Sequence, residues 1–186
     1  MPYLCCASLH TTIGVNSYVQ IIKIIRDILD DLYAVESNKF KAFLSNRGFH
    51  ALLIYRISNL LYRWHIPLLP MILTRIVQII YSIDIDWRAK IAGGVVIVHG
   101  VGVVIGQGAE IGAGTKLYHG VTLGISHSNN DGFPKIGRDV LVGAGAKILG
   151  KVNVGDNAKI GANAVVLSDV PPNAIAVGVP AKIKNL

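Results

Sequence analysis

The sequence predicts a parallel β-helix built from hexapeptide repeats and preceded by an α-helical region. An aliphatic residue returns at every sixth position, and glycine follows four of these residues directly. A period of six fits neither the 3.6-residue repeat of an α-helix nor the two-residue alternation of a strand. In a hexapeptide β-helix, each hexad lays one short strand on one face of a prism. The regular part of this ladder is Ile136, Val142, Ile148, Val154, Ile160 and Val166.

The same register begins earlier in the chain and is interrupted twice. One set of rungs is Ile85, Ile91 and Ile97, and a second set is Ile105, Ile111, Leu117 and Leu123. Two inserted residues separate the sets. Between Leu123 and Ile136, seven residues exceed one hexad, so we expect residues 125–134, rich in Ser, Asn, Asp and Gly, to form a loop. Long loops on repeat scaffolds commonly carry function.

The first part of the chain has helical periodicity. Residues 17–35 read as an amphipathic helix, residues 38–64 as a second helical region and residues 71–82 as a third. Pro67 and Pro70 are expected to separate the last two. We therefore expect two domains: an N-terminal helical region at 1–82 and the β-helix at 83–186.

Composition limits the partners of the chain. Its net charge is +7, but it has no basic run and no interleaving of aromatic and basic residues, so a nucleic-acid partner is not expected. Hydrophobic residues make up 52% of the chain, which indicates apolar faces that pack on sister subunits or on a membrane surface. Arginines interrupt the apolar stretch 51–85, and its longest uncharged run, Trp64 to Thr74, is too short to span a bilayer.

The sequence also gives an expectation for the compartment. Cys5 and Cys6 are adjacent, and vicinal cysteines seldom pair with each other, so a reducing cytoplasm is the default. The first fifteen residues lack the basic start of a secretory signal. We therefore expect a cytoplasmic protein, with a position at the inner face of the membrane as the alternative.

The rungs predict which residues stack. If three hexads make one turn, Ile97, Leu117, Val142 and Ile160 share a column, with successive strands ~4.8 Å apart. The residues two places later are His99, His119, Ala144 and Ala162. This column predicts a groove that is lined by small side chains and ends at two imidazoles. A groove of this kind suits a narrow ligand whose reactive end lies beside a base. Asp84 is a carboxylate of the kind that orients a basic imidazole.

Several motifs resemble those of bacterial serine acetyltransferases, and the match runs from about Gly48 to Ile183. They are Gly48-Phe-His-Ala-Leu-Leu-Ile-Tyr-Arg-Ile57, Ile83-Asp-Ile-Asp86, His99-Gly-Val-Gly102, Val121-Thr-Leu-Gly124, Val142-Gly-Ala-Gly-Ala-Lys-Ile-Leu-Gly150 and Val177-Gly-Val-Pro-Ala-Lys-Ile183. The resemblance implies a left-handed parallel β-helix that assembles as a homotrimer, with pairing of trimers left open. It also implies acetyl-CoA as cosubstrate, His99 as the base that deprotonates an acceptor hydroxyl, and Asp84 as the residue that positions its imidazole.

The resemblance also suggests where acetyl-CoA binds. Ala144 and Ala162 match positions that line the pantetheine groove, Gly124 and Ser126 match positions near the thioester, and Lys182 is a candidate phosphate contact. No metal is expected. An alternative zinc site would need His99, His119 and His127, which lack the close spacing of zinc ligands.

The departures concern the acceptor. Serine acetyltransferases carry an aspartate before the catalytic histidine, where this chain has Val98, and Arg-His in the long loop, where it has Gly132-Phe133. His119 replaces the family's glutamine. Without the charged groups, serine loses charge-assisted hydrogen bonds worth roughly 1.5–3 kcal/mol each.

These departures favour another acceptor. We predict an O-acetyltransferase that acts on a small-molecule acceptor, a sugar of a surface-polysaccharide precursor, as in the acetyltransferases of colanic-acid and other polysaccharide clusters. His119, Phe133 and Val98 are the expected acceptor contacts. The alternative is serine O-acetylation for cysteine synthesis. Two further alternatives are a zinc hydratase and a non-catalytic β-helix scaffold.

Overall fold

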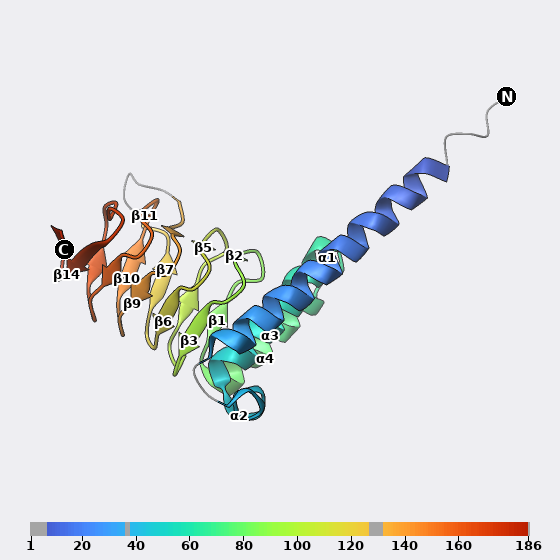
Figure 1. Cartoon of the computed structure of the whole chain (residues 1–186), viewed down its shortest axis with the longest axis horizontal. Helices are drawn as coiled ribbons and strands as arrows, with labels where there is room; N and C mark the ends of the chain where they lie inside the picture. The colour runs from blue at the N-terminus through green and yellow to red at the C-terminus, as the bar shows by residue number, and fades with distance from the viewer. Residues whose placement is uncertain (1–6, 36–37, 127–131, 186) are drawn as a thin grey trace.

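The computed structural model describes residues 7–35, 38–126 and 132–185, with side chains from residue 17 to residue 184 within these ranges. Four helices precede a stack of short strands (Figure 1). The helices are α1 (Ala7–Ala34), α2 (Lys39–Ser45), α3 (Arg47–Arg63) and α4 (Leu69–Tyr81). Among the described residues, no helix has the length and apolarity needed to cross a membrane. The expected boundary between residues 82 and 83 falls between α4 and the first strand and stays a prediction.

The helical region differs from the predicted one at three places. The first helix begins at Ala7, ten residues before the predicted start at residue 17. Residues 38–64 form two helices because Asn46 ends α2 and caps α3, where its side chain accepts a hydrogen bond from the Phe49 amide at 2.9 Å. Pro70 lies in the first turn of α4 rather than before it, a position at which proline removes no helical hydrogen bond.

The strands wind into a three-sided parallel solenoid, as the hexads predict. Face A consists of β1, β4, β7, β10 and β13, face B of β2, β5, β8 and β11, and face C of β3, β6, β9, β12, β14 and β15. All neighbours pair in parallel except β14 and β15. The strands are β1 (Asp84–Ile85), β2 (Lys90–Ile91), β3 (Val96–Val98), β4 (Val104–Ile105), β5 (Glu110–Ile111), β6 (Lys116–Tyr118), β7 (Thr122–Gly124), β8 (Lys135–Ile136), β9 (Leu141–Val142), β10 (Lys147–Leu149), β11 (Asn153–Val154), β12 (Lys159–Ile160), β13 (Val165–Val166), β14 (Ala174–Val177) and β15 (Lys182–Asn185).

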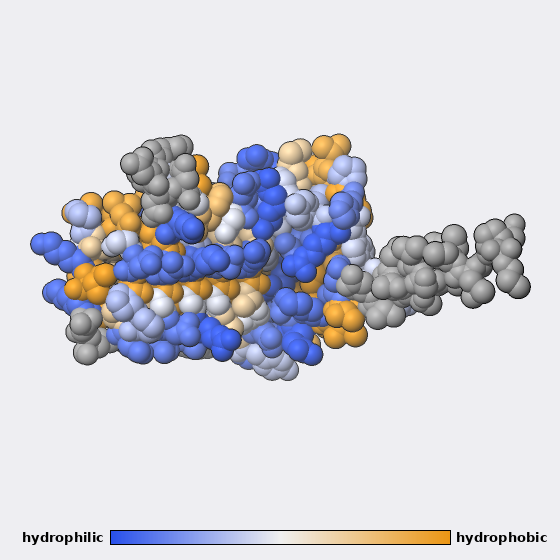
Figure 2. All heavy atoms as spheres, turned by 90° about the horizontal axis from the view of Figure 1, so that it is seen from above, coloured by the Kyte–Doolittle hydropathy of each residue, from blue (hydrophilic) through white to orange (hydrophobic). Residues whose placement is uncertain are grey.

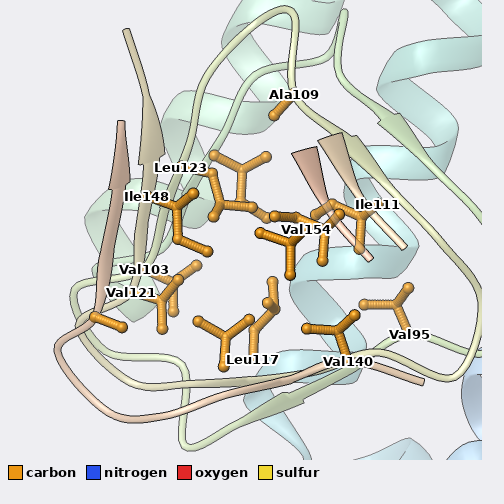
Figure 3. Close-up of a cluster of buried hydrophobic side chains, with 14 of the residues drawn as sticks. Val95, Val103, Ala109, Ile111, Leu117, Val121, Leu123, Val140, Ile148 and Val154 are labelled. Carbon is orange, nitrogen blue, oxygen red and sulfur yellow. The ribbon is translucent and has the colours of Figure 1, made fainter. Parts of the chain in front are cut away.

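The predicted rungs form the core of the solenoid. Every rung from Ile85 to Val166 is buried, and so are the small residues four positions after the later rungs. Leu117 of face C, Ile148 of face A and Ile111 of face B point into the same interior (Figure 3). The burial of aliphatic side chains from all three faces stabilises the stack, and it explains why the six-residue period predicts it.

A buried ion pair joins the helices to the solenoid. Arg56 on α3 donates to both carboxylate oxygens of Asp31 on α1, at 2.8 and 3.0 Å. The same guanidinium donates to the carbonyls of Ile91 and Ala92 at 2.9 and 2.8 Å. Burial raises the pKa of the Asp31 carboxyl, and the hydrogen bonds from Arg56 oppose that rise. This contact fixes α1 and α3 on the first coil.

Exposed apolar residues gather on the helices. Ile22 and Ile25 of α1 and Ile76, Ile79 and Ile80 of α4 are exposed. Figure 2 shows apolar patches at the helical end of the molecule, and along the solenoid it shows hydrophilic bands with apolar residues between them. These surfaces agree with the expectation that the helices pack on a sister subunit or a membrane surface, and that expectation stays a prediction.

Candidate active site

His99 lies at the corner between faces C and A, directly after β3. Ile97 and Ile105 are eight residues apart here, whereas Leu117 and Leu123 in the next coil are six apart. The extra residues form a bulge in which His99, Gly100 and Gly102 all have left-handed backbone conformations, with φ of 64°, 72° and 73°. This conformation is uncommon for a residue with a side chain. The bulge carries the imidazole to the surface, where it is exposed.

The predicted column is confirmed for His119, Ala144 and Ala162, but it is wrong for His99. The register pairs Ile97, Leu117, Val142 and Ile160 as expected. At the corner, however, the amide of Gly120 donates to Val101, and that of Gly145 donates to His119, both at 2.8 Å. Val101 therefore stacks on His119, because the two inserted residues lie on this corner and displace His99 from the column.

The two imidazoles nevertheless lie side by side. The ring centroids of His99 and His119 are 6.1 Å apart, with an angle of 63° between the ring planes. From His119 the corner continues through Ala144 to Ala162, since the amide of Asn163, the residue after Ala162, donates to the Ala144 carbonyl at 2.8 Å. One edge of the solenoid therefore presents imidazoles at its helical end and small side chains below them.

Lys182 lies at the far end of this edge. The turn before it is held at the start of β13, because Val165 donates to Gly178 at 3.0 Å and accepts from Ala181 at 2.8 Å. Lys182 is exposed there. The structure thus brings four predicted residues, His119, Ala144, Ala162 and Lys182, to the edge between faces C and A, in the order that the coils stack.

Three other predicted residues lie at the opposite edge of face A. Gly124 ends β7, and Ser126 follows it at the corner between faces A and B. Phe133 lies at the same corner, where its ring covers Gly106 and Gly108: a Cβ atom at these positions would come within 2.5 and 2.3 Å of ring atoms. The width of face A separates these residues from His99 within one chain.

Val98 and Asp84 are near the His99 corner in different ways. Val98 precedes His99, is half-buried and pairs with Tyr118 in the register. Asp84 begins β1 on face A, and its carboxylate accepts a hydrogen bond from Gln78 at 3.1 Å. Among the residues that the structure describes, no hydrogen bond joins Asp84 to His99, so the positioning role of Asp84 stays a prediction.

A hollow that the sequence did not indicate opens beside His99. Its volume is about 260 Å³, and its lining residues are Ser45, Asn46, Arg47, Gly48, His99 and Val101. Sequence reasoning missed Arg47, although it directly precedes the Gly48 motif. A hollow of about 390 Å³ on face C also reaches His99 and Asn46, and it is lined by Val98 and Tyr118. A hollow of about 440 Å³ between the helices and face B does not include His99.

No group of three or more His, Cys, Asp or Glu side chains in the described part of the chain is arranged to hold a metal ion. His127, which the alternative zinc site requires, lies outside the described residues.

Comparisons with known proteins identify the family. Residues 133–168 match the model for bacterial transferase hexapeptide (six repeats). The serine acetyltransferase of Helicobacter pylori (strain 26695) is 47% identical over 146 residues, which cover 78% of this chain and 85% of that protein. The chain belongs to the hexapeptide-repeat transferases, as a homologue of serine acetyltransferases. The enzyme of Escherichia coli K12 is 44% identical over 138 residues, 74% of this chain but 50% of that protein.

Solved structures agree with this assignment. Neisseria gonorrhoeae serine acetyltransferase in complex with serine has a TM-score of 0.83 at 36% identity and covers 90% of this chain and 71% of its own. A serine acetyltransferase in complex with CoA has the same TM-score at 37% identity and covers 91% and 73%. This chain is therefore an O-acetyltransferase. The comparisons support serine acetyltransferase, the alternative from the sequence, and they give no support to the predicted polysaccharide branch.

Proposed function

We propose that this chain transfers the acetyl group of acetyl-CoA to the hydroxyl of L-serine, giving O-acetyl-L-serine and CoA. One observation carries the proposal: the exposed His99 lies between a small hollow and an edge of small side chains. Acetyl-CoA lies along Ala144 and Ala162 with its phosphates toward Lys182, and the acceptor enters from the helical side. The relatives, and the structures of such enzymes with serine and with CoA, support these ligands.

His99 acts as the general base in this proposal. Its imidazole takes the proton of the serine hydroxyl while the oxygen attacks the carbonyl carbon of the thioester. The carbon–sulfur bond then breaks, and the CoA sulfur receives the proton from the imidazolium. Such catalysis contributes about 10²–10⁴-fold in rate. Asp84 orients the imidazole, since the start of β1 is tied to the His99 corner by the hydrogen bond from the Gly102 amide to the Ser82 carbonyl at 2.7 Å.

The site requires a second copy of the chain. Gly124, Ser126 and Phe133 lie at the corner between faces A and B, on the other edge of face A from His99. In the homotrimer that we propose, the corner between faces A and B of one copy packs against the corner between faces C and A of the next. That arrangement brings these three residues to a neighbour's His99, as the sequence predicts for the thioester and acceptor contacts.

A sugar hydroxyl is the second candidate acceptor, and one observation favours it. Val98 beside His99 and Phe133 in the loop are uncharged where serine acetyltransferases carry charged or polar groups. An aromatic ring and an aliphatic side chain suit the apolar face of a sugar.

Release of CoA from acetyl-CoA distinguishes the two acceptors. The purified protein is assayed with L-serine, and in parallel with a panel of sugars and nucleotide sugars, and the acetylated product is identified by mass. We expect turnover with L-serine at ordinary enzyme rates, on the order of 1–10³ s⁻¹. Turnover with a sugar and none with serine would contradict the proposal and would identify the chain as an O-acetyltransferase that acts on a sugar.

A further inference from the structure

Arg47 shares the small hollow with His99. The hollow is formed on one side by the junction of α2 and α3, from Ser45 to Gly48, and on the other by the His99 bulge. Arg47 is the one Lys or Arg among its lining residues. The hollow's volume of about 260 Å³ is below the roughly 300–1,000 Å³ of pockets for drug-sized ligands, so it suits a small acceptor.

Close packing fixes the start of α3, and so the backbone of Arg47, against the His99 strand. A Cβ atom at Gly48 would lie 2.1 Å from the Ile97 carbonyl oxygen, so only glycine permits this approach. On the other side of Arg47, Asn46 caps α3. His50, also in the first turn of α3, holds this turn to α2 and α4. One of its ring nitrogens forms a hydrogen bond with the Phe43 carbonyl at 2.7 Å, and the other forms one with the Tyr81 hydroxyl at 3.0 Å.

The Arg47 guanidinium is available to a ligand. It is exposed, and within the described ranges its side chain makes no hydrogen bond or ion pair. Arg56, by contrast, is buried and bound to Asp31, and Arg88 is paired with Asp86 at 2.8 Å. A guanidinium presents two parallel N–H donors that match the two oxygens of a carboxylate.

We propose that Arg47 binds the carboxylate of the acceptor while the acceptor's hydroxyl reaches His99. This inference rests on the proposed function and names the group that selects serine. It also accounts for the loop: with Gly132 and Phe133 in place of Arg-His, the charge that recognises the acceptor comes from the first residue of α3 instead. Arg47 is thus a specificity-determining residue that lies outside the motifs quoted from the sequence, the first of which begins at Gly48.

The test is Arg47→Gln, assayed with L-serine and with L-serinamide, which keeps the hydroxyl and the ammonium but lacks the carboxylate. We expect the KM for L-serine to rise about 10- to 100-fold, the range for a charge-assisted hydrogen bond. The kinetics with L-serinamide and the KM for acetyl-CoA stay within about twofold of the wild type, because neither involves the lost ion pair. Arg47→Lys restores part of the loss, since it keeps the charge without the planar fork.

The matched control is Arg63→Gln at the other end of α3, where the arginine is also exposed but lies outside this hollow. It should leave the KM for L-serine unchanged. If the wild type turns over L-serine but Arg47→Gln leaves its KM unchanged, or weakens serinamide equally, the Arg47 inference fails alone. If the wild type does not acetylate L-serine, the proposed function fails, and this inference with it.

Discussion

Gly48→Ala should reduce both the stability of the protein and its use of the acceptor. The added Cβ would lie 2.1 Å from the Ile97 oxygen and 2.9 Å from Ile97 Cβ, whereas ordinary contacts begin at 3.4 Å. The start of α3 must therefore move by about 1 Å from β3. Overpacking of this kind costs about 1–3 kcal/mol, and the better helix propensity of alanine returns at most about 1 kcal/mol. We expect the free energy of unfolding to fall by about 1–2 kcal/mol.

The same displacement moves Arg47 relative to His99. Because misplacement by about 1 Å can cost on the order of 10²-fold in rate, kcat/KM for L-serine should fall by up to about that factor. The KM for acetyl-CoA should not change, since Ala144, Ala162 and Lys182 lie on coils farther along the stack from α3. Urea denaturation and initial rates measure the two effects, with Arg63→Ala as the control, because Arg63 is an exposed residue at the other end of α3. A Gly48→Ala protein of wild-type or higher stability with normal serine kinetics would refute the reasoning.

Three further variants test other parts of the account. His99→Ala should lower kcat by about 10²–10⁴-fold, because it removes the general base. The control is His65→Ala, which changes an exposed histidine and should leave kcat unchanged, and near-normal turnover in His99→Ala would show that His99 is not the general base. Ala162→Leu should raise the KM for acetyl-CoA at least about tenfold, because the larger side chain occupies the space in which the ligand lies and weakens binding by more than about 1.4 kcal/mol. Ala113→Leu at another corner is the control, and an equal effect of the two substitutions would contradict the proposed position of acetyl-CoA. Arg56→Met should cost about 3–5 kcal/mol in urea denaturation because it leaves the Asp31 carboxyl buried without its partner, and unchanged stability would show that the pair is not needed.

The repeat could be predicted because its cause is local in the sequence. Each rung is buried by the same arrangement of three faces, so a six-residue period is sufficient to find Ile97, Leu117 and Val142 in one column. The position of an insertion is not determined by counting. The pairing of Val98 with Tyr118 and of Val104 with Thr122, and the hydrogen bond from Gly120 to Val101, show that the two extra residues lie at the His99 corner.

The parts that could not be predicted depend on contacts between distant segments. Arg47 and His99 are 52 positions apart in the sequence, and nothing in either segment indicates that Gly48 packs on Ile97. The apolar stretch around Arg56 gave no sign that this arginine is buried against Asp31. Phe133 was expected beside the acceptor, and one chain alone leaves it across face A from His99.

The most direct test of the central claim is the identity of the product. The wild-type protein and His99→Ala are each incubated with L-serine and acetyl-CoA labelled with ¹³C in the acetyl group, and the products are followed by NMR. The account predicts that the wild type forms O-acetyl-L-serine with the label on the side-chain oxygen, and that His99→Ala forms it at least about 10²-fold more slowly. Absence of labelled O-acetyl-L-serine in the wild-type reaction, or equal rates in the two proteins, would contradict it.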